Sequence, residues 1–334
     1  MDKFKKSTVL VMLTLITLCL LISSPEASGS EFTLRYAGNM PLNHHVTKGQ
    51  YLFAKLVEER TKGRVGVSVY PAAQLFADKD YVKAVPSGAV DMAKASLSQW
   101  TGLVPGLLVL DIPLIFSDAN HLRRFVDGEG GEIMKKELEK VGVKHIHWME
   151  YGVMEIASKM PIRTLEDFKG KRIRGYGELM TESIKLLGAA PTFLGGGEVY
   201  MALQRGTIDG AISGPSSFWE RKYYDVTKFV SISNFTFYTY GVVMNMNKWN
   251  EFPPDIQNII LSCAKEVQEW SRKEAELEDK KSLELLKEKG MEIYYLPEKE
   301  KQRWIKACEP LVNSVINRSG ETGKRLIELV EKTR

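Results

Sequence analysis

One arginine stands where it could hold a small anion. Arg174 ends an expected strand, residues 171–174, and a glycine-rich stretch, residues 175–177, follows it. Ligands of open α/β sheets sit beyond the carboxyl ends of the strands, so this position would bring a guanidinium to the mouth of a cleft. The planar guanidinium matches a carboxylate with two parallel hydrogen bonds. The sequence therefore predicts a carboxylate site at Arg174, while Arg172 lies a pleat further from the cleft.

Serine hydroxyls follow two further expected strands, residues 90–93 and 208–212. They are Ser96 and Ser98 after the first strand, and Ser213, Ser216 and Ser217 after the second. Polar groups of this kind suit a binding cleft, but a serine beside a base can also act as a nucleophile. A secreted enzyme acting on a small carboxylate is therefore the alternative to a binding protein. No histidine lies in residues 151–243, which are expected to form one side of the cleft. A base would therefore have to come from the other side, across the hinge that is expected to join the two sides.

Metal and nucleotide chemistry find little support in the motifs. His145 and His147 share one strand face, but no cysteine or further histidine accompanies them at zinc-site spacing. The glycines 195–197 open an expected helix whose N–H groups could hold an anion, or they only make room beside a bulky neighbour. The sequence contains no P-loop, G-x-S-x-G or H-E-x-x-H motif. We therefore expect no metal and no cofactor.

The composition is that of an ordinary globular protein. Across 334 residues, 46 Lys and Arg stand against 42 Asp and Glu, and the net charge of +4 excludes the basic footprint of a nucleic-acid-binding protein. The three cysteines, Cys19, Cys263 and Cys308, form no C-x-x-C pair, which argues against a disulfide scaffold. Cys263 and Cys308 are left open as either a bridge or two buried free thiols.

The first 30 residues have the plan of a secretory signal peptide. A lysine-rich start precedes an apolar run, residues 8–22, and small residues follow it up to Ser30. The run is shorter than the roughly 20 residues that span a bilayer, so removal is favoured over a permanent anchor. We predict cleavage near Gly29 or Ser30. The mature chain is then periplasmic and does not itself span the membrane.

The mature chain alternates short strands with helices, which predicts parallel sheets in an α/β fold. Residues 80–93 and 198–211 align without a gap as helix, glycine stop and apolar-Asp-x-Ala strand. Any βα unit with a glycine cap looks like this, but the alternative is two α/β lobes of related plan that face each other. A long helix, residues 255–289, is expected to brace both lobes. The predicted division is 1–30 signal peptide, 31–153 first lobe, 154–243 second lobe and 244–334 return to the first lobe.

Several blocks resemble the DctP-type solute receptors of tripartite ATP-independent periplasmic (TRAP) transporters. They include Val69-Tyr-Pro71-Ala-Ala-Gln74-Leu75 and Asp111-Ile-Pro113-Leu-Ile-Phe116, besides residues 33–36, 53–59, 161–174, 187–189, 198–204 and 223–229. The resemblance runs over nearly the whole mature chain in the family's order. It implies a two-lobed periplasmic-binding-protein fold with hinge strands, which closes on a small organic acid. It also implies delivery to a membrane permease driven by an ion gradient.

The same resemblance implies individual site residues. Arg174 falls where family members hold the ligand carboxylate, and Asn39 and Asp78 fall where sialic-acid-binding members contact their ligand. Other positions depart from those members by losing charge or bulk: Met154 replaces an arginine, Gly196 an aromatic residue, Ser96 a glutamate and Ser213 an asparagine. We therefore expect one anchored carboxylate and do not expect sialic acid.

Four aromatic residues are expected to border the cleft, and they suggest a ligand with an apolar or cyclic body. They are Trp100, Trp219, Tyr238 and Tyr240. If Met154 lines the cleft, its strand neighbour Glu155 points away, and a second ligand charge would have no partner. The sequence therefore predicts a monocarboxylate in preference to C4-dicarboxylates.

Overall fold

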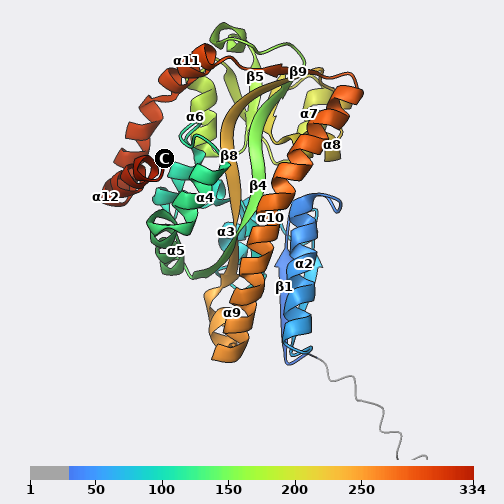
Figure 1. Ribbon diagram of the computed structural model, residues 1–334, viewed down its shortest axis with the longest axis vertical. Coiled ribbons are helices and arrows are strands. Elements are labelled where there is room, and N and C mark those ends of the chain that lie inside the picture. The colour runs from blue at the N-terminus through green and yellow to red at the C-terminus, as the bar shows by residue number, and fades with distance from the viewer. Residues whose placement is uncertain (1–29) are drawn as a thin grey trace, which may run out of the picture.

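The structure is a computed structural model that describes residues 30–334, and Figure 1 shows its arrangement. The strands of this part form one nine-stranded mixed sheet in the order β2-β1-β3-β8-β4-β7-β5-β6, with β9 beside β8. The predicted α/β class is confirmed. All but the last residue of the predicted signal peptide, residues 1–30, lies outside the described residues.

The first lobe is built on three parallel strands with β1 in the middle. They are β1 (Phe32–Ala37), β2 (Val65–Tyr70), which alternating valines predict, and β3 (Met92–Ala95). Helix α2 (His45–Arg60) links β1 to β2, and the short helices η1 (Asp78–Asp80) and α3 (Tyr81–Ala84) lead to β3. The lobe also contains η2 (Leu97–Gln99), η3 (Pro105–Asp111), α4 (Ala119–Asp127) and α5 (Glu129–Lys140).

The second lobe repeats this plan on β5 (Arg172–Gly175), β6 (Ala190–Phe193) and β7 (Gly210–Ser213). Its helices are η4 (Leu165–Phe168), α6 (Glu178–Leu186), α7 (Val199–Gln204), α8 (Pro215–Glu220) and η5 (Tyr223–Asp225). The strands predicted at residues 171–174 and 208–212 lie within two residues of β5 and β7.

The two lobes share one strand order, β2-β1-β3 in the first and β6-β5-β7 in the second. The two aligned segments occupy equivalent places, because α3 leads to β3 in one lobe and α7 leads to β7 in the other. Each of these third strands then pairs antiparallel with a long strand, β3 with β8 and β7 with β4. The predicted relation between the lobes is therefore confirmed at the level of topology.

Two long antiparallel strands run through both lobes. They are β4 (Val143–Ser158) and β8 (Phe229–Asn245), and three register shifts interrupt their pairing. Helix α10 (Pro254–Glu288) packs on β4 and contacts α2 in the first lobe and α8 in the second. Figure 1 shows α10 running the length of the molecule beside these strands, as the sequence predicted for residues 255–289.

The remaining C-terminal elements touch both lobes. They are α9 (Met246–Glu251), β9 (Glu292–Tyr295), α11 (Glu298–Cys308) and α12 (Pro310–Lys332). Strand β9 pairs with the start of β8, and Trp304 of α11 packs edge-on against Phe168 of η4. Helix α12 packs on η3 and α5 and also reaches α6. Cys263 and Cys308 are both buried and unbridged, which is one of the two states the sequence left open.

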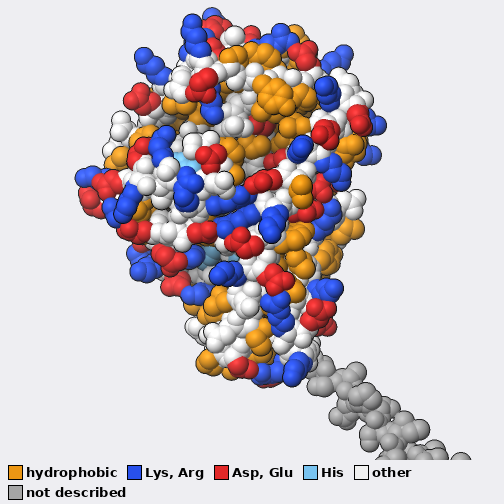
Figure 2. Space-filling view, in the orientation of Figure 1, with side chains coloured by type: hydrophobic (Ala, Val, Ile, Leu, Met, Phe, Trp, Pro, Cys, Tyr) orange, Lys and Arg blue, Asp and Glu red, His pale blue; other side chains and the backbone are white. Residues whose placement is uncertain are grey.

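The visible surface carries both signs of charge. Figure 2 shows Lys and Arg side chains intermingled with Asp and Glu over this face. Beneath the surface, one apolar core runs through both lobes and two smaller ones belong to one lobe each. Within residues 30–334, no helix has the length and apolarity needed to cross a bilayer.

Candidate functional site

A cavity of about 640 Å³ lies between the two lobes and is bordered by the two long strands. Seven of the eight site residues predicted from the sequence line it: Arg174, Asn39, Asp78, Ser96, Met154, Ser213 and Tyr240. The strand ends bring them together, since residues after β1 and β3 meet residues of β5 and β7 across β4 and β8. The eighth residue, Trp219, does not line the cavity.

Arg174 is held at the cavity by backbone oxygens alone. Its Nε donates to the carbonyl of Leu194 at 3.0 Å, and its Nη1 donates to the carbonyl of Ile212 at 2.8 Å. The residue is only 6% exposed, and among the described residues no carboxylate oxygen lies within 4.0 Å of its guanidinium nitrogens. Burial lowers the pKa of Arg174. A buried cation without a counter-ion, with donors left toward a cavity, is suited to bind an anion.

A second cation, Lys94, which the sequence reasoning missed, lies behind the cavity wall opposite Arg174. The fully buried Nζ of Lys94 donates to Asn39 Oδ1 at 2.5 Å and lies 3.7 Å from Asp78 Oδ1. It also sits 3.5 Å from the centre of the Tyr240 ring. Burial lowers the pKa of Lys94 to about 8 and raises the pKa of Asp78. The available signal was a lysine inside the buried strand Met92–Ala95, because a lysine there needs a partner.

Arg221, which follows α8, is a third cation and lines the cavity itself. Its Nη2 donates to the backbone oxygen of Asn39 at 3.3 Å, so it joins the second lobe to the first. The expectation that a second ligand charge finds no partner is therefore wrong. Met154 indeed offers no charge, but a guanidinium 67 positions later in the chain reaches the same space. The signal in the sequence was its spacing from Ser217, because residues four positions apart lie on the same face of a helix.

Two of the four predicted aromatic residues line the cavity and two do not. Tyr238 and Tyr240 line it together with Tyr151 and Tyr176, which the sequence reasoning missed. The prediction for Trp100 is wrong, because its ring is fully buried in the core of the first lobe. The prediction for Trp219 is also wrong, because this ring lies on the other side of α8 from the cavity-lining Ser217 and packs 5.1 Å from Tyr224.

A chain of hydroxyls connects the cavity to a buried acid. Ser96 Oγ lies 2.5 Å from the hydroxyl of Tyr238, which lies 3.1 Å from Ser98 Oγ, which donates to Asp111 at 2.7 Å. Burial raises the pKa of Asp111 to about 7. The chain ties the end of β3 to the strand β8, so Ser96 and Tyr238 present fixed hydroxyls to a ligand.

His44 of the first lobe meets the serines of the second. Its Nε2 lies 3.4 Å from Ser216 Oγ and from Ser217 Oγ, while its Nδ1 accepts the N–H of Val46 and caps α2. A capping Nδ1 cannot carry a proton, so the neutral ring carries its proton on Nε2, which faces the serines. His44 therefore donates to these hydroxyls and does not act as their base. Burial lowers the pKa of His44 well below its usual value.

The two strand histidines pack inside the protein. His145 lies 4.2 Å from the ring of Trp148, and His147 stacks on Phe53 at 5.8 Å. In residues 30–334, no three His, Cys, Asp or Glu side chains are grouped so as to hold a metal ion. The glycines 195–197 line the cavity, and the N–H of Gly195 donates to Glu198 at 2.7 Å.

Comparison with known proteins adds independent information. Residues 36–319 match the family model DctP, described as bacterial extracellular solute-binding protein, family 7. The C4-dicarboxylate-binding periplasmic protein DctP of Rhodobacter capsulatus is 31% identical over 82% of this chain and 83% of its own.

Two solved structures are also similar to this chain. A TRAP periplasmic solute-binding protein of Sulfurospirillum deleyianum with bound succinate is 33% identical, with a TM-score of 0.85 over 91% of this chain and all of its own. Another, from Desulfovibrio salexigens with bound orotic acid, is 26% identical, with a TM-score of 0.86 over 90% of this chain and 98% of its own.

Proposed function

The chain belongs to the DctP family of TRAP solute-binding proteins, and from this premise we propose that it captures a small organic acid in the periplasm and delivers it to a TRAP membrane permease. The family and its carboxylate ligands are the established part. The particular acid, the permease partner, export by the signal peptide and the absence of an enzymatic activity belong to the proposal.

One observation carries the proposal, namely the unpaired guanidinium of Arg174 in the cavity between the lobes. We propose that the ligand carboxylate completes its hydrogen bonds. Asn39, Asp78, Ser96, Ser213 and Tyr240 contact the remainder of the ligand, with Met154 as an apolar part of the wall.

Three contacts between the lobes support capture by hinge closure. Gln99 Nε2 donates to the carbonyl of Tyr176 at 2.6 Å, and the contacts of Arg221 with Asn39 and of His44 with the serines of α8 also join the two lobes. We propose that the lobes close about β4 and β8. A ligand that touches both lobes favours the closed state because it binds that state more tightly.

Two ligand classes compete, each with its own observation. The four tyrosines favour the monocarboxylate with a cyclic body that the sequence predicted. Arg221 favours a second carboxylate, as in the succinate that the Sulfurospirillum deleyianum relative binds. We propose an organic acid anchored on Arg174 in either case.

Thermal unfolding with succinate, orotate, D-glucuronate, branched 2-oxo acids, aromatic carboxylates and sialic acid tests the proposal. At least one of the carboxylates should raise the melting temperature, and chromatography should recover it unchanged. Conversion of the acid would establish an enzyme instead. No stabilisation by any of them would reject a receptor for these acids.

A further inference from the structure

A fully buried lysine, Lys94, lies behind one wall of the cavity and does not line it. Resting on the proposed function, we infer that Lys94 is a positioning residue that fixes the orientation of the Asn39 amide and thereby makes this wall a hydrogen-bond donor toward the ligand. Asn39, Asp78 and Tyr240 line the cavity, and Lys94 lies behind all three.

The chemistry of the ammonium group dictates the orientation of the amide. A lysine ammonium has three donors and no acceptor, whereas an asparagine amide has an oxygen on one side and an NH₂ on the other. Only the amide oxygen can therefore face Lys94, and Asn39 Oδ1 does so at 2.5 Å. The NH₂ group is left on the side of the cavity. A carboxylate or hydroxyl oxygen of a ligand is the partner that this group can bind.

The surroundings of Lys94 make this arrangement hard to replace. The ammonium is fully buried, so it needs all of its partners, which are the Asn39 oxygen, the Asp78 carboxylate and the face of the Tyr240 ring. Removing the ammonium frees the Asn39 amide to turn its oxygen toward the cavity, where it repels a ligand carboxylate. It also leaves Asp78 without its counter-charge.

The charge of Lys94 depends on its neighbours in a measurable way. Burial and the nearby Arg221 lower its pKa to about 8, while Asp78 acts in the opposite direction. The other titratable or charged groups beside this cluster are Tyr240, His44 and Arg174, whose charge acts on Asp78. As the pH rises through about 8, the amine loses the proton that excludes the reversed amide. Affinity for a carboxylate should therefore fall above pH 8 in the wild-type protein.

A double-mutant cycle tests whether Lys94 acts through Asn39. Calorimetry with succinate and D-glucuronate is performed on the wild type, Lys94→Met, Asn39→Ala and the double variant, using whichever acid binds the wild type more tightly. Lys94→Met should weaken binding by roughly tenfold or more, and the loss should nearly vanish in the Asn39→Ala background. Lys79→Met removes a charge from the exposed rim of the same cavity, and its effect should add to that of Asn39→Ala.

The pH profile separates positioning from general stability. The loss of affinity above pH 8 should disappear in Lys94→Met, because that side chain does not titrate. Full additivity in the cycle, wild-type affinity in Lys94→Met, or the same pH profile in both proteins would overturn the inference.

A ligand-free measurement keeps this inference separate from the proposed function. In nuclear magnetic resonance of the wild-type protein, the side-chain amide of Asn39, assigned with Asn39→Ala, should shift with a midpoint near pH 8. An amide that does not titrate in that range would refute the role of Lys94 even if Lys94→Met does not fold. If neither acid binds the wild type while the amide titrates, the choice of ligand class fails and the positioning of Asn39 stands.

Discussion

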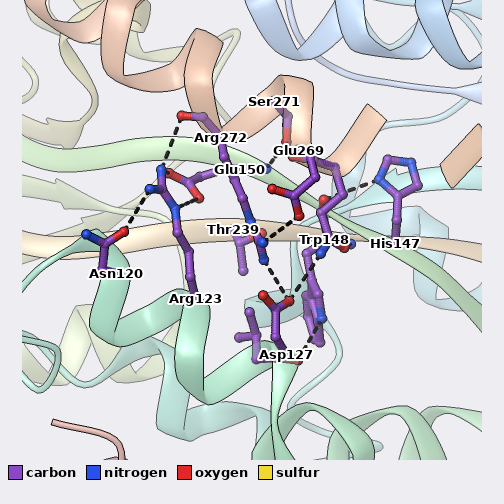
Figure 3. A network of polar contacts seen from close by, with 12 residues as sticks. Asn120, Arg123, Asp127, His147, Trp148, Glu150, Thr239, Glu269, Ser271 and Arg272 are labelled. Atoms are coloured by element: carbon purple, nitrogen blue, oxygen red, sulfur yellow. Dashed lines mark hydrogen bonds and ion pairs between the residues drawn. The ribbon is translucent and has the colours of Figure 1, made fainter. Parts of the chain in front are cut away.

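Two arginines are shielded in this molecule in opposite ways. Arg123 of α4 donates to both carboxylate oxygens of Glu150 at 2.9 and 2.6 Å and to the carbonyl of Arg272 (Figure 3). It also pairs with Glu276 at 2.7 Å. Arg174 of β5 donates its hydrogen bonds only to carbonyl oxygens and lies 5.8 Å from the centre of the Tyr176 ring. The first arginine has its counter-charges in direct contact, whereas the second faces the cavity with no carboxylate within ion-pair distance among the described residues. This difference distinguishes a structural charge from a binding group better than burial does.

The cluster of charged groups around Arg123 has a mechanical role. Arg272 of α10 pairs with Asp127 at 2.7 Å, and Ser271 Oγ accepts the N–H of Glu150 at 3.1 Å. Figure 3 shows these side chains converging from α4, β4 and α10. The cluster therefore fastens the long helix to a hinge strand on the first-lobe side. Its substitution should affect stability, whereas substitution at Arg174 should affect binding.

The sharpest test of this comparison is Arg174→Ala. It should reduce affinity for the best-binding acid by about thirty-fold to several thousand-fold, because a desolvated carboxylate would lose its partner. The melting temperature without ligand should stay the same or rise, since a buried uncompensated charge is removed. Arg174→Lys should also bind poorly, because a lysine ammonium cannot form the two parallel hydrogen bonds that a guanidinium makes to a carboxylate. Calorimetry that finds affinity within about threefold of wild type would place the anchor elsewhere.

At the Arg123 pair we expect a loss of stability and no loss of binding. Glu150→Ala, which removes the carboxylate partner of Arg123, should lower the free energy of unfolding by about 3 kcal/mol because it breaks a buried pair. Affinity for the same acid should remain within about twofold. Denaturant titration and calorimetry on one preparation give both values.

Glu132→Ala is the matched control for Glu150→Ala. Glu132 forms an exposed helical pair with Lys135, so its loss should change stability by less than about 0.5 kcal/mol. A large loss of affinity in Glu150→Ala at unchanged stability would contradict the division between the two arginines.

Local patterns predicted the fold well because local rules generate it. Valine alternation marked β2, and glycine stops marked the helices that precede β3 and β7. Arg174 was found because the end of a strand fixes where a side chain emerges. Residue patterns did not predict the length of β4 and β8, since the bulges in these strands break the alternation that marks a strand.

The missed and mistaken residues share one cause, which is long-range packing. Lys94 acquires its role from Asn39, 55 positions away, and Arg221 meets the same residue from 182 positions away. Trp100 and Trp219 lie close in the chain to cavity residues, but each turns to a different face. Sequence spacing places a residue near the cleft and does not determine which way it points.

A smaller effect is expected from His44, one of the three contacts between the lobes. In the structure this ring is buried beside His45, Arg221, Lys94 and Lys48, which holds its pKa well below 6.5. Opening would return the pKa toward 6.5, so below that pH the open state takes up the proton. Affinity should therefore fall as the pH drops below about 6.5, by at most about tenfold per pH unit.

His44→Asn tests this dependence by keeping a capping acceptor that does not titrate. Its affinity should change little between pH 7.5 and 5.5, whereas that of the wild type should decrease. His145→Gln is the control, because His145 is buried against Trp148 and does not touch the second lobe's serines. Equal pH dependence in His44→Asn and the wild type would remove His44 from the closure mechanism.

The smallest effect concerns Cys263 and Cys308, which extend the comparison to reactive groups. Like Arg174, both thiols are buried, and they form no disulfide, but neither reaches the cavity. Burial raises the pKa of both, that of Cys308 to about 12, so the reactive thiolate is scarce. Reducing agent should leave the melting temperature unchanged, and a thiol reagent should label these residues only after unfolding. A lower melting temperature with reductant would show a bridge between α10 and α11. Rapid labelling of the native protein would show that burial away from the cavity does not prevent these thiols from reacting.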